Sequence, residues 1–215
     1  MNVNTLSYFK SRFGFDGTQT MPIDLPDFNR FDMAAMFHVL GFDKGVEIGV
    51  ERGYFSEALC KANPDLHLYC VDPWVTYESG HIEHRTPETV AEFMEQAKKR
   101  LSKYNVTIIR QGSIKASTKF KHNTLDFVYI DGDHGFEATI NDCAVWSKRV
   151  RPGGIIAGHD YYDNLKDPIL RTGPAVRLFT KAFDISPWFT FGRTFTNSDL
   201  KFKRDSCRSF MWIKE

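Results

Sequence analysis

The sequence lacks the features that mark secreted, membrane-spanning and zinc-binding proteins. It does not open with a basic segment followed by an apolar core, and nowhere do about eighteen apolar residues follow one another. Cys60, Cys70, Cys143 and Cys207 show no C-x-x-C spacing, which argues against a metal site and for reduced, mostly buried thiols. We therefore expect a soluble, cytoplasmic protein that has no membrane partner.

The sequence also lacks an excess of one charge. Lys and Arg number 28 against 27 Asp and Glu, which leaves a formal net charge of +1. Because the basic residues are scattered and form no stripe, we do not expect nucleic acid or an anionic membrane as the main partner. A small-molecule substrate is compatible with this balance.

The length and composition suit one domain. A chain of 215 residues with 42% hydrophobic residues can form one full α/β domain but is short for two. We expect that domain over residues 29–215 and an N-terminal arm over residues 1–28, with a short helix at Leu6–Phe13. The aromatic residues of the arm are expected to pack on the flank of the domain. Closure of the active site and a homodimer contact are the alternatives.

One stretch organises the rest of the chain. Residues 45–60, GVEIGVERGYFSEALC, combine an apolar run from Val46 to Val50, a glycine turn and a helical pattern that begins at Tyr54. Such a strand, turn and helix aim backbone N–H groups and the positive end of a helix dipole at the crevice above a sheet. The glycines at 49 and 53 do not spell the dinucleotide fingerprint G-x-G-x-x-G.

Strand and helix patterns alternate along the remainder, which predicts a doubly wound, mostly parallel α/β sheet with helices on both faces. Seven strand patterns lie at residues 46–50, 66–71, 106–110, 125–131, 155–158, 188–194 and 209–213. Helical patterns lie at residues 29–40, 54–60, 87–104, 136–150 and 173–183. The expected fold is therefore a seven-stranded sheet.

Chemically active residues follow the predicted parallel strands at their carboxyl ends, where ligands of such sheets bind. These residues are Glu47, Gly49, Gly53, Asp72, Ser113, Asp131 and Asp160. Asp72 ends the second of these strands 19 residues after Gly53, where nucleotide-binding α/β domains place a carboxylate that accepts the ribose hydroxyls. NAD enzymes share this feature, so Asp72 indicates a ribose rather than one cofactor.

Three motifs identify a family. Glu47-x-Gly49-x-x-x-Gly53, LDFVYIDGDHGFEAT and RPGGIIAGHDY together resemble class I methyltransferases that use S-adenosylmethionine, in the branch of macrocin O-methyltransferase and the cephalosporin-biosynthesis proteins. The resemblance covers roughly residues 29–183. It implies a Rossmann-like sheet with an antiparallel last strand and methyl transfer to a hydroxyl of a small molecule, such as a sugar or a polyhydroxylated metabolite.

The resemblance also implies a cofactor site. In that family the glycines let the backbone approach the methionine part of S-adenosylmethionine, and the acid at the position of Glu47 orients the turn and the amino end. A polar loop at Ser113 contacts the adenine, although Ser113 as a plain helix N-cap explains the residue equally well. The expected cofactor-binding residues are Glu47, Gly49, Gly53, Asp72, Ser113 and Asp131.

A divalent metal is the second expectation from the resemblance. Metal-dependent catechol methyltransferases place an acid after the fourth strand and an Asp-Asn pair after the fifth, where this chain has Asp131 and His159-Asp160. Mg²⁺ is expected on Asp131 and Asp160, or Mn²⁺, Fe²⁺ or Zn²⁺ if His159 joins the shell, with Asp133 in reserve. His134 stands three residues after Asp131, at the position of the family's basic lysine, and imidazole suits a base at neutral pH.

Other interpretations stay open. The acids can instead cap helices or satisfy backbone groups, with His134 as a structural hydrogen-bonding group, and without a metal either histidine can serve as the catalytic base. The chain can keep the cofactor and catalyse another reaction such as hydroxylation, or act as a non-catalytic module. An NAD-dependent oxidoreductase is disfavoured by the glycine spacing. The loop at residues 75–86, with His81 and His84, is expected to form a solvated lid rather than a metal site.

Overall fold

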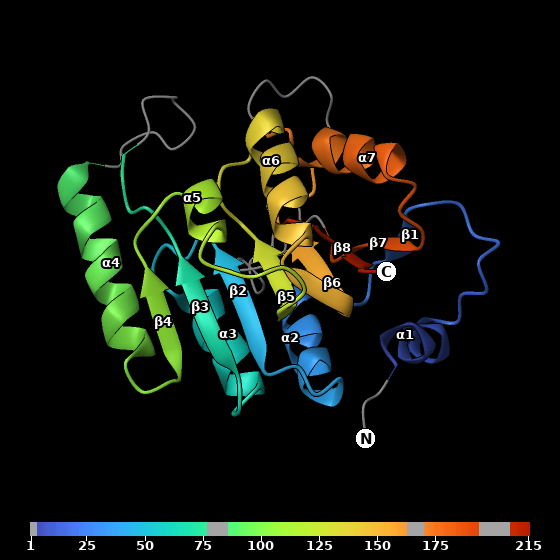
Figure 1. Ribbon diagram of the computed structural model, residues 1–215, viewed down its shortest axis with the longest axis horizontal. Coiled ribbons are helices and arrows are strands. Elements are labelled where there is room, and N and C mark those ends of the chain that lie inside the picture. Colours follow the sequence, from blue (N-terminus) through green and yellow to red (C-terminus); the bar gives the residue numbers. More distant parts are fainter. Residues whose placement is uncertain (1–3, 77–85, 163–169, 194–206) are drawn as a thin grey trace.

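The computed structural model describes residues 4–76, 86–162, 170–193 and 207–215 (Figure 1). A mixed sheet forms its centre, with strands in the order β1-β7-β8-β6-β5-β2-β3-β4. The strands are β1 (Ile23–Leu25), β2 (Lys44–Ile48), β3 (His67–Val71), β4 (Val106–Ile109), β5 (Leu125–Ile130), β6 (Val150–Gly158), β7 (Trp188–Phe191) and β8 (Ser209–Ile213). The helices are α1 (Thr5–Phe13), α2 (Arg30–Val39), α3 (Tyr54–Ala62), α4 (Pro87–Leu101), α5 (Ser113–Ser117), α6 (Phe136–Ser147) and α7 (Thr172–Ala182).

The sheet is doubly wound, as predicted. Strand β2 pairs in parallel with both β3 and β5, so the strand order reverses between β2 and β5. Strand β8 runs antiparallel to β6 and to β7, which confirms the antiparallel last strand. The carboxyl ends of β2, β3, β5 and β6 consequently meet at one edge of the sheet.

The sheet has eight strands, and the prediction of seven was wrong. The additional strand, β1, lies within the N-terminal arm and pairs in parallel with β7, with Ile23 opposite Phe189 and Leu25 opposite Phe191. Three residues between Pro22 and Pro26 are too few to show a period of two, so only the partner strand reveals them.

Strand β6 begins at Val150 rather than at the expected Ile155. The segment RPGG was predicted to be a turn but continues the strand, and pairing with β5 shifts register between Leu125 and Phe127. Gly154 makes this possible, because a Cβ at that position would overlap the carbonyl oxygen of Asp126.

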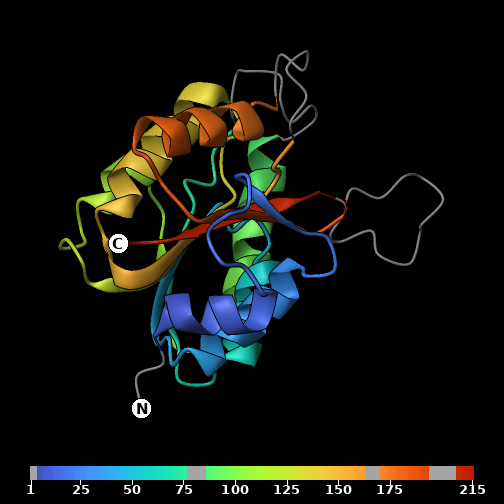
Figure 2. The ribbon, with the colours of Figure 1, turned by 90° about the vertical axis from the view of Figure 1, so that its right-hand side faces the viewer.

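Helices cover both faces of the sheet (Figures 1 and 2). One core includes side chains of α1, α2, α3 and α4, and the other includes side chains of α5, α6 and α7. Strand β5 serves both cores, since Phe127 and Tyr129 belong to the first and Val128 and Ile130 to the second. Side chains of successive strand residues point to opposite faces, so the apolar run Phe127–Ile130 of β5 is explained by burial on both sides.

The predicted helix starts are confirmed. Asn29 caps α2 in a capping box with Asp32, and the side chain of Thr86 caps α4 ahead of Pro87.

No helix in the described part of the chain is long and apolar enough to cross a membrane.

The aromatic residues of the arm pack on the flank of the sheet, which was the favoured of the three interpretations. Phe9 and Phe15 each lie 5.3 Å from Phe189 between ring centroids, and Phe13 lies 5.2 Å from Phe28.

The cysteines also match the prediction, because all four carry free thiols and three are buried.

Candidate active site

A cavity of about 630 Å³ opens at the carboxyl ends of β2, β3, β5 and β6. Eight of the nine residues predicted for the site line it, namely Glu47, Gly49, Asp72, Ser113, Asp131, His134, His159 and Asp160. Gly53 does not line it but is the N-cap residue of α3, with φ 73°, and an added Cβ would lie 3.2 Å from Cδ1 of Leu101 on α4. This glycine therefore serves helix packing within the described structure.

The turn after β2 brings bare backbone to the cavity. Gly49 has φ 85°, and a Cβ there would overlap the carbonyl oxygen of Asp131. The backbone N–H of Gly49 donates to the carbonyl of Val71 at 2.9 Å, and that of Asp131 donates to the carbonyl of Ile48 at 2.8 Å. Only glycine fits here, because both the dihedral angle and the close approach of β5 exclude a side chain.

Glu47 lies at the inner wall of the cavity and is almost completely buried. The hydroxyl of Ser56 donates a hydrogen bond to its Oε2. Burial raises the pKa of Glu47 to about 8, although the bond from Ser56 opposes the shift. A cation placed in the cavity would favour the charged form of this carboxyl group.

Asp72 braces the glycine turn. Its Oδ2 accepts hydrogen bonds from the backbone N–H groups of Val50 and Glu51 at 3.0 and 2.9 Å, and its Oδ1 accepts one from Trp74 at 2.7 Å. Oδ1 thereby keeps a second lone pair for a ligand. The carboxylate thus combines the predicted position with a structural role that the sequence did not indicate.

Trp74 is a wall residue that the sequence analysis missed. Its side chain is buried, its φ is 44°, and its Nε1–H donates to the carbonyl of Glu51 at 2.9 Å. The only signal was its place in Asp72-Pro73-Trp74, directly after a predicted strand.

Ser113 is not the N-cap of α5, so that alternative was wrong. Gly112 occupies the cap and Ser113 is the first helical residue. Its hydroxyl donates to Oδ1 of Asp142 and accepts from Nε1 of Trp146 at 2.8 Å. Burial raises the pKa of Asp142 to about 6 against the opposing bond from Ser113. Sequence analysis missed Asp142 because it lies in the buried stripe of α6.

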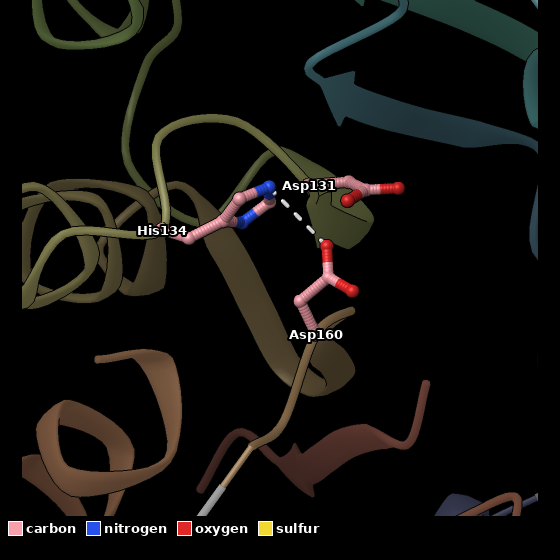
Figure 3. Close-up of side chains that lie close together, drawn as sticks. All are labelled: Asp131, His134 and Asp160. Carbon is pink, nitrogen blue, oxygen red and sulfur yellow. Dashed lines mark ion pairs between the residues drawn. The ribbon is translucent and has the colours of Figure 1, made fainter. Parts of the chain in front are cut away.

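Asp131, His134 and Asp160 come together where β5 and β6 end (Figure 3). One ligand atom from each lies within 4.8 Å of the others, and Nε2 of His134 is 3.2 Å from Oδ2 of Asp160. Asp160 has φ 50°, a strained conformation for a residue other than glycine that is typical of functional sites. Pairing of Ile130 with Gly158 makes the two strands neighbours, as the metal hypothesis required.

His159 lies beside this cluster but is not one of its three members. Its side chain is 10% exposed, and its Nδ1 is 3.3 Å from Oδ1 of Asp160 and 3.7 Å from Oδ1 of Asp131. Burial raises the pKa of Asp131, whereas His159 and His134 hold the pKa of Asp160 below its ordinary value despite burial. The cluster that could hold a metal ion thus contains His134, while the predicted His159 lies against the same two acids beside it.

The remaining predicted positions have different outcomes. Asp133 lines the cavity and accepts a hydrogen bond from the backbone N–H of Gly135 at 2.8 Å. His81 and His84 of the expected lid lie outside the described residues.

Comparisons with known proteins agree with this architecture. The family model described as a methyltransferase domain matches residues 46–161. The chain is similar to a putative rRNA-methylase from Clostridium thermocellum, with a TM-score of 0.58 and 17% identity over 86% of this chain and 95% of that one. No similar sequence was found among curated proteins.

Two further solved structures are O-methyltransferases. The enzyme from Bacillus cereus, in complex with SAH, has a TM-score of 0.59 and 15% identity over 98% of this chain and 89% of that one. TomG from Streptomyces achromogenes, involved in tomaymycin synthesis and in complex with SAM, has a TM-score of 0.57 and 15% identity over 100% and 92%. The chain therefore belongs to the methyltransferase-domain family, and its fold is that of the class I S-adenosylmethionine-dependent methyltransferases.

Proposed function

We propose that this chain transfers a methyl group from S-adenosylmethionine to a hydroxyl group of a small molecule, a sugar or a polyhydroxylated metabolite, with the help of a divalent cation. One observation carries the proposal. Asp131, His134 and Asp160 bring ligand atoms within 4.8 Å of one another inside the cavity that the Gly49 turn borders. Alignment of donor and acceptor is the main requirement of an in-line displacement, and a shared cavity supplies it.

The residues fit the donor. Bare backbone at Gly49 allows close approach, Oδ1 of Asp72 can accept from a ribose hydroxyl, and Glu47 lies where an ammonium group would ionise it. A cavity of about 630 Å³ is within the ordinary size of small-ligand sites. The donor supplies an electrophilic methyl group on a sulfonium. The complexes of two similar structures with SAM and SAH support this assignment.

The donor atoms also fit a divalent cation. Two carboxylates and one imidazole nitrogen suit Mn²⁺, Fe²⁺ or Zn²⁺ better than Mg²⁺, which prefers oxygen ligands alone. Such an ion would polarise the acceptor oxygen and lower the pKa of its hydroxyl group.

His134 could act as the catalytic base or as a ligand of the cation. The two roles exclude each other at Nε2, which either donates its hydrogen to Asp160 or binds the cation. As a base, it would donate its Nε2–H to Asp160, which fixes the ring and leaves Nδ1 to take the proton of the acceptor hydroxyl. As a ligand, it would help to hold the cation through Nε2, and the acceptor hydroxyl, made more acidic by the cation, would lose its proton to solvent water. Binding of Mn²⁺ to the His134→Ala variant separates the two, because only a ligand role requires the affinity for Mn²⁺ to fall.

The test is a panel of hydroxylated metabolites incubated with the protein and S-adenosylmethionine, with mass spectrometry to detect an added methyl group. Activity should vanish in EDTA and return with Mn²⁺ or Mg²⁺. His134→Ala should lower turnover and leave donor affinity intact, whereas His122→Ala, an exposed histidine outside the cavity, should change neither. Full activity in EDTA would remove the metal from the mechanism, and methylation at nitrogen or carbon alone would contradict the hydroxyl assignment.

A further inference from the structure

A second cavity lies against the sheet, apart from the active-site cavity, and carries the opposite charge. It has a volume of about 590 Å³ and shares no lining residue with the active-site cavity. Among the residues that the structure describes, four that line it are basic, Lys44, Arg110, Lys119 and Lys121, and none is an acid. The active-site cavity has seven acids in its lining. The second cavity, called the basic hollow from here on, therefore suits an anionic ligand.

The basic hollow exists because one helix is short. The connection from β4 to β5 carries α5, which has five residues, and Figure 1 shows this helix near the carboxyl ends of β3 and β4. Tyr69 of β3 and Ile109 of β4 point to the same face of the sheet, since they pack in the core that includes side chains of α5 and α6. Both also line the hollow, so α5 leaves part of this face open.

Two of the lysines are held at the rim by a buried phenylalanine. Phe120 is 8% exposed, and its ring centroid lies 4.9 Å from that of Tyr69 and 5.4 Å from that of Trp146. Its neighbours in the chain, Lys119 and Lys121, are both exposed. The backbone N–H of Phe120 donates to the carbonyl of Ser117 at 3.2 Å, which fixes this loop on the end of α5. The two ammonium groups are thus tethered on either side of a fixed anchor.

The other two basic residues approach from the strands. Lys44 begins β2, and its Nζ lies 6.0 Å from the ring centroid of Tyr69. Arg110 directly follows β4, and its Nε is 3.5 Å from the carbonyl oxygen of Pro73, a long contact. Within the described part of the chain, no acid forms an ion pair with Lys44, Arg110, Lys119 or Lys121. Four cations without a counter-charge repel one another, and an anion placed among them would relieve that repulsion.

The number and kind of these groups indicate the chemistry of the ligand. Four cations around one small cavity match a ligand with several negative charges rather than a single carboxylate. Lysine binds phosphate as a point charge and arginine binds it through a planar fork, so this set suits phosphate oxygens. A volume of about 590 Å³ is that of a small-molecule site. The remaining basic residues are scattered over a chain of net charge +1, which does not favour a long nucleic acid.

We propose that the basic hollow binds a small molecule that carries a chain of phosphate groups. Lys119 and Lys121 contact this chain from the loop after α5, and Lys44 and Arg110 contact it from the strands. The site is separate from the methyl-transfer cavity, and the inference does not depend on the proposed function.

The test is calorimetry with inorganic tripolyphosphate at constant ionic strength, in EDTA so that no metal ion bridges the ligand to the active-site acids. The wild type should bind tripolyphosphate, and orthophosphate should bind at least about tenfold more weakly because it carries fewer charges. The double variant Lys119→Gln/Lys121→Gln should bind tripolyphosphate at least about tenfold more weakly, since two partly screened cationic contacts are lost.

Two further variants make the test specific. Lys98→Gln/Lys99→Gln is the matched control, because it removes the same charge from two exposed neighbouring lysines that do not line the hollow. Its affinity should stay within about twofold of the wild type. Lys44→Gln removes a cation from the opposite wall and should weaken binding at least about fivefold, as a ligand inside the hollow requires.

A comparison with ATP distinguishes two sources of such a chain. Equal affinities for ATP and tripolyphosphate would support a site for the phosphate chain alone. Tighter binding of ATP that is lost in Lys119→Gln/Lys121→Gln would support a nucleotide site.

Other results would overturn the inference. These are no binding of tripolyphosphate to the wild type, an equal loss in the two double variants, or unchanged affinity in Lys44→Gln, which would place the ligand on the exposed loop alone. Tighter binding of an oligouridylate or of a polyglutamate peptide than of tripolyphosphate would also overturn it, in favour of a macromolecular partner. Failure of the protein to bind S-adenosylmethionine would contradict the proposed function and leave this inference intact.

Discussion

The cavity and the aromatic flank are built on opposite principles. The aromatic flank, defined as Phe9, Phe13, Phe15, Phe28, Phe189 and Phe191, joins the N-terminal arm to β7 through ring contacts with centroid distances of 5.2–6.1 Å. The cavity buries carboxyl groups instead, and burial raises the pKa of Glu47, Asp131 and Asp142.

The difference shows where stability and function lie in this molecule. Each ring pair of the flank contributes about 0.5–1.5 kcal/mol beyond the area that it buries. In the cavity, desolvated acids and the positive φ angles of Glu51, Trp74 and Asp160 cost free energy. Such costs persist where the surrounding fold enforces them, which is the reason that the flank and the cavity should respond differently to substitution.

The largest effect on donor affinity is expected at Gly49. An alanine there would overlap the carbonyl oxygen of Asp131 and require φ 85°, so Gly49→Ala should lower donor affinity by at least about a hundredfold and also destabilise the fold. Calorimetry and urea unfolding measure the two effects. Gly112→Ala is the control, since a Cβ meets nothing within 4 Å there, and a loss as large as that of Gly49→Ala would contradict the argument.

The next effect is expected in the aromatic flank. Phe189 is completely buried and contacts three rings of the arm, so Phe189→Ala should lower the free energy of unfolding by about 3–5 kcal/mol and leave donor affinity unchanged. Phe183→Ala, at a side chain that is 66% exposed, should change stability by less than about 0.5 kcal/mol. A fall in donor affinity in Phe189→Ala would show that the two regions are not independent.

Replacement of a buried acid should raise the free energy of unfolding at neutral pH, which is the opposite of the effect expected in the aromatic flank. Because the pKa of Glu47 is raised from 4.5 to about 8 on folding, the folded state binds more protons between these values, and stability falls as pH rises through this window. Between about pH 5 and pH 7.5, the wild type should lose roughly 3 kcal/mol relative to Glu47→Gln, which keeps an oxygen for Ser56. If urea unfolding shows the same pH dependence of stability in the two proteins, the ionisation of Glu47 is not the cause of that dependence.

The smallest of the four effects is expected at Asp72. If its carboxylate accepts the ribose hydroxyls, Asp72→Ala should weaken donor binding by at least about tenfold. Asp65→Ala, at an exposed acid before β3, is the control. Equal calorimetric affinities in wild type and Asp72→Ala would leave Asp72 with its structural role alone, as the brace of the glycine turn.

The sequence by itself determined the doubly wound fold and the place of the site. Strand and helix periods are local, and a parallel sheet must bring the carboxyl ends of its strands to one edge. For that reason Glu47, Gly49, Asp72, Asp131 and Asp160 were predicted to meet, and they line one cavity.

Tertiary structure decided which side chains face one another. Arg30 and Asp142 belong to helices whose patterns indicate only capping and burial, so their part in the cavity depends on how α2 and α6 pack. His134 reaches the two acids from the loop after β5 and His159 from the end of β6, and the loop backbone, including the positive φ of Asp160, places these side chains together. Contacts between residues far apart in the chain, and loop dihedral angles without a period, leave no local pattern from which to predict them.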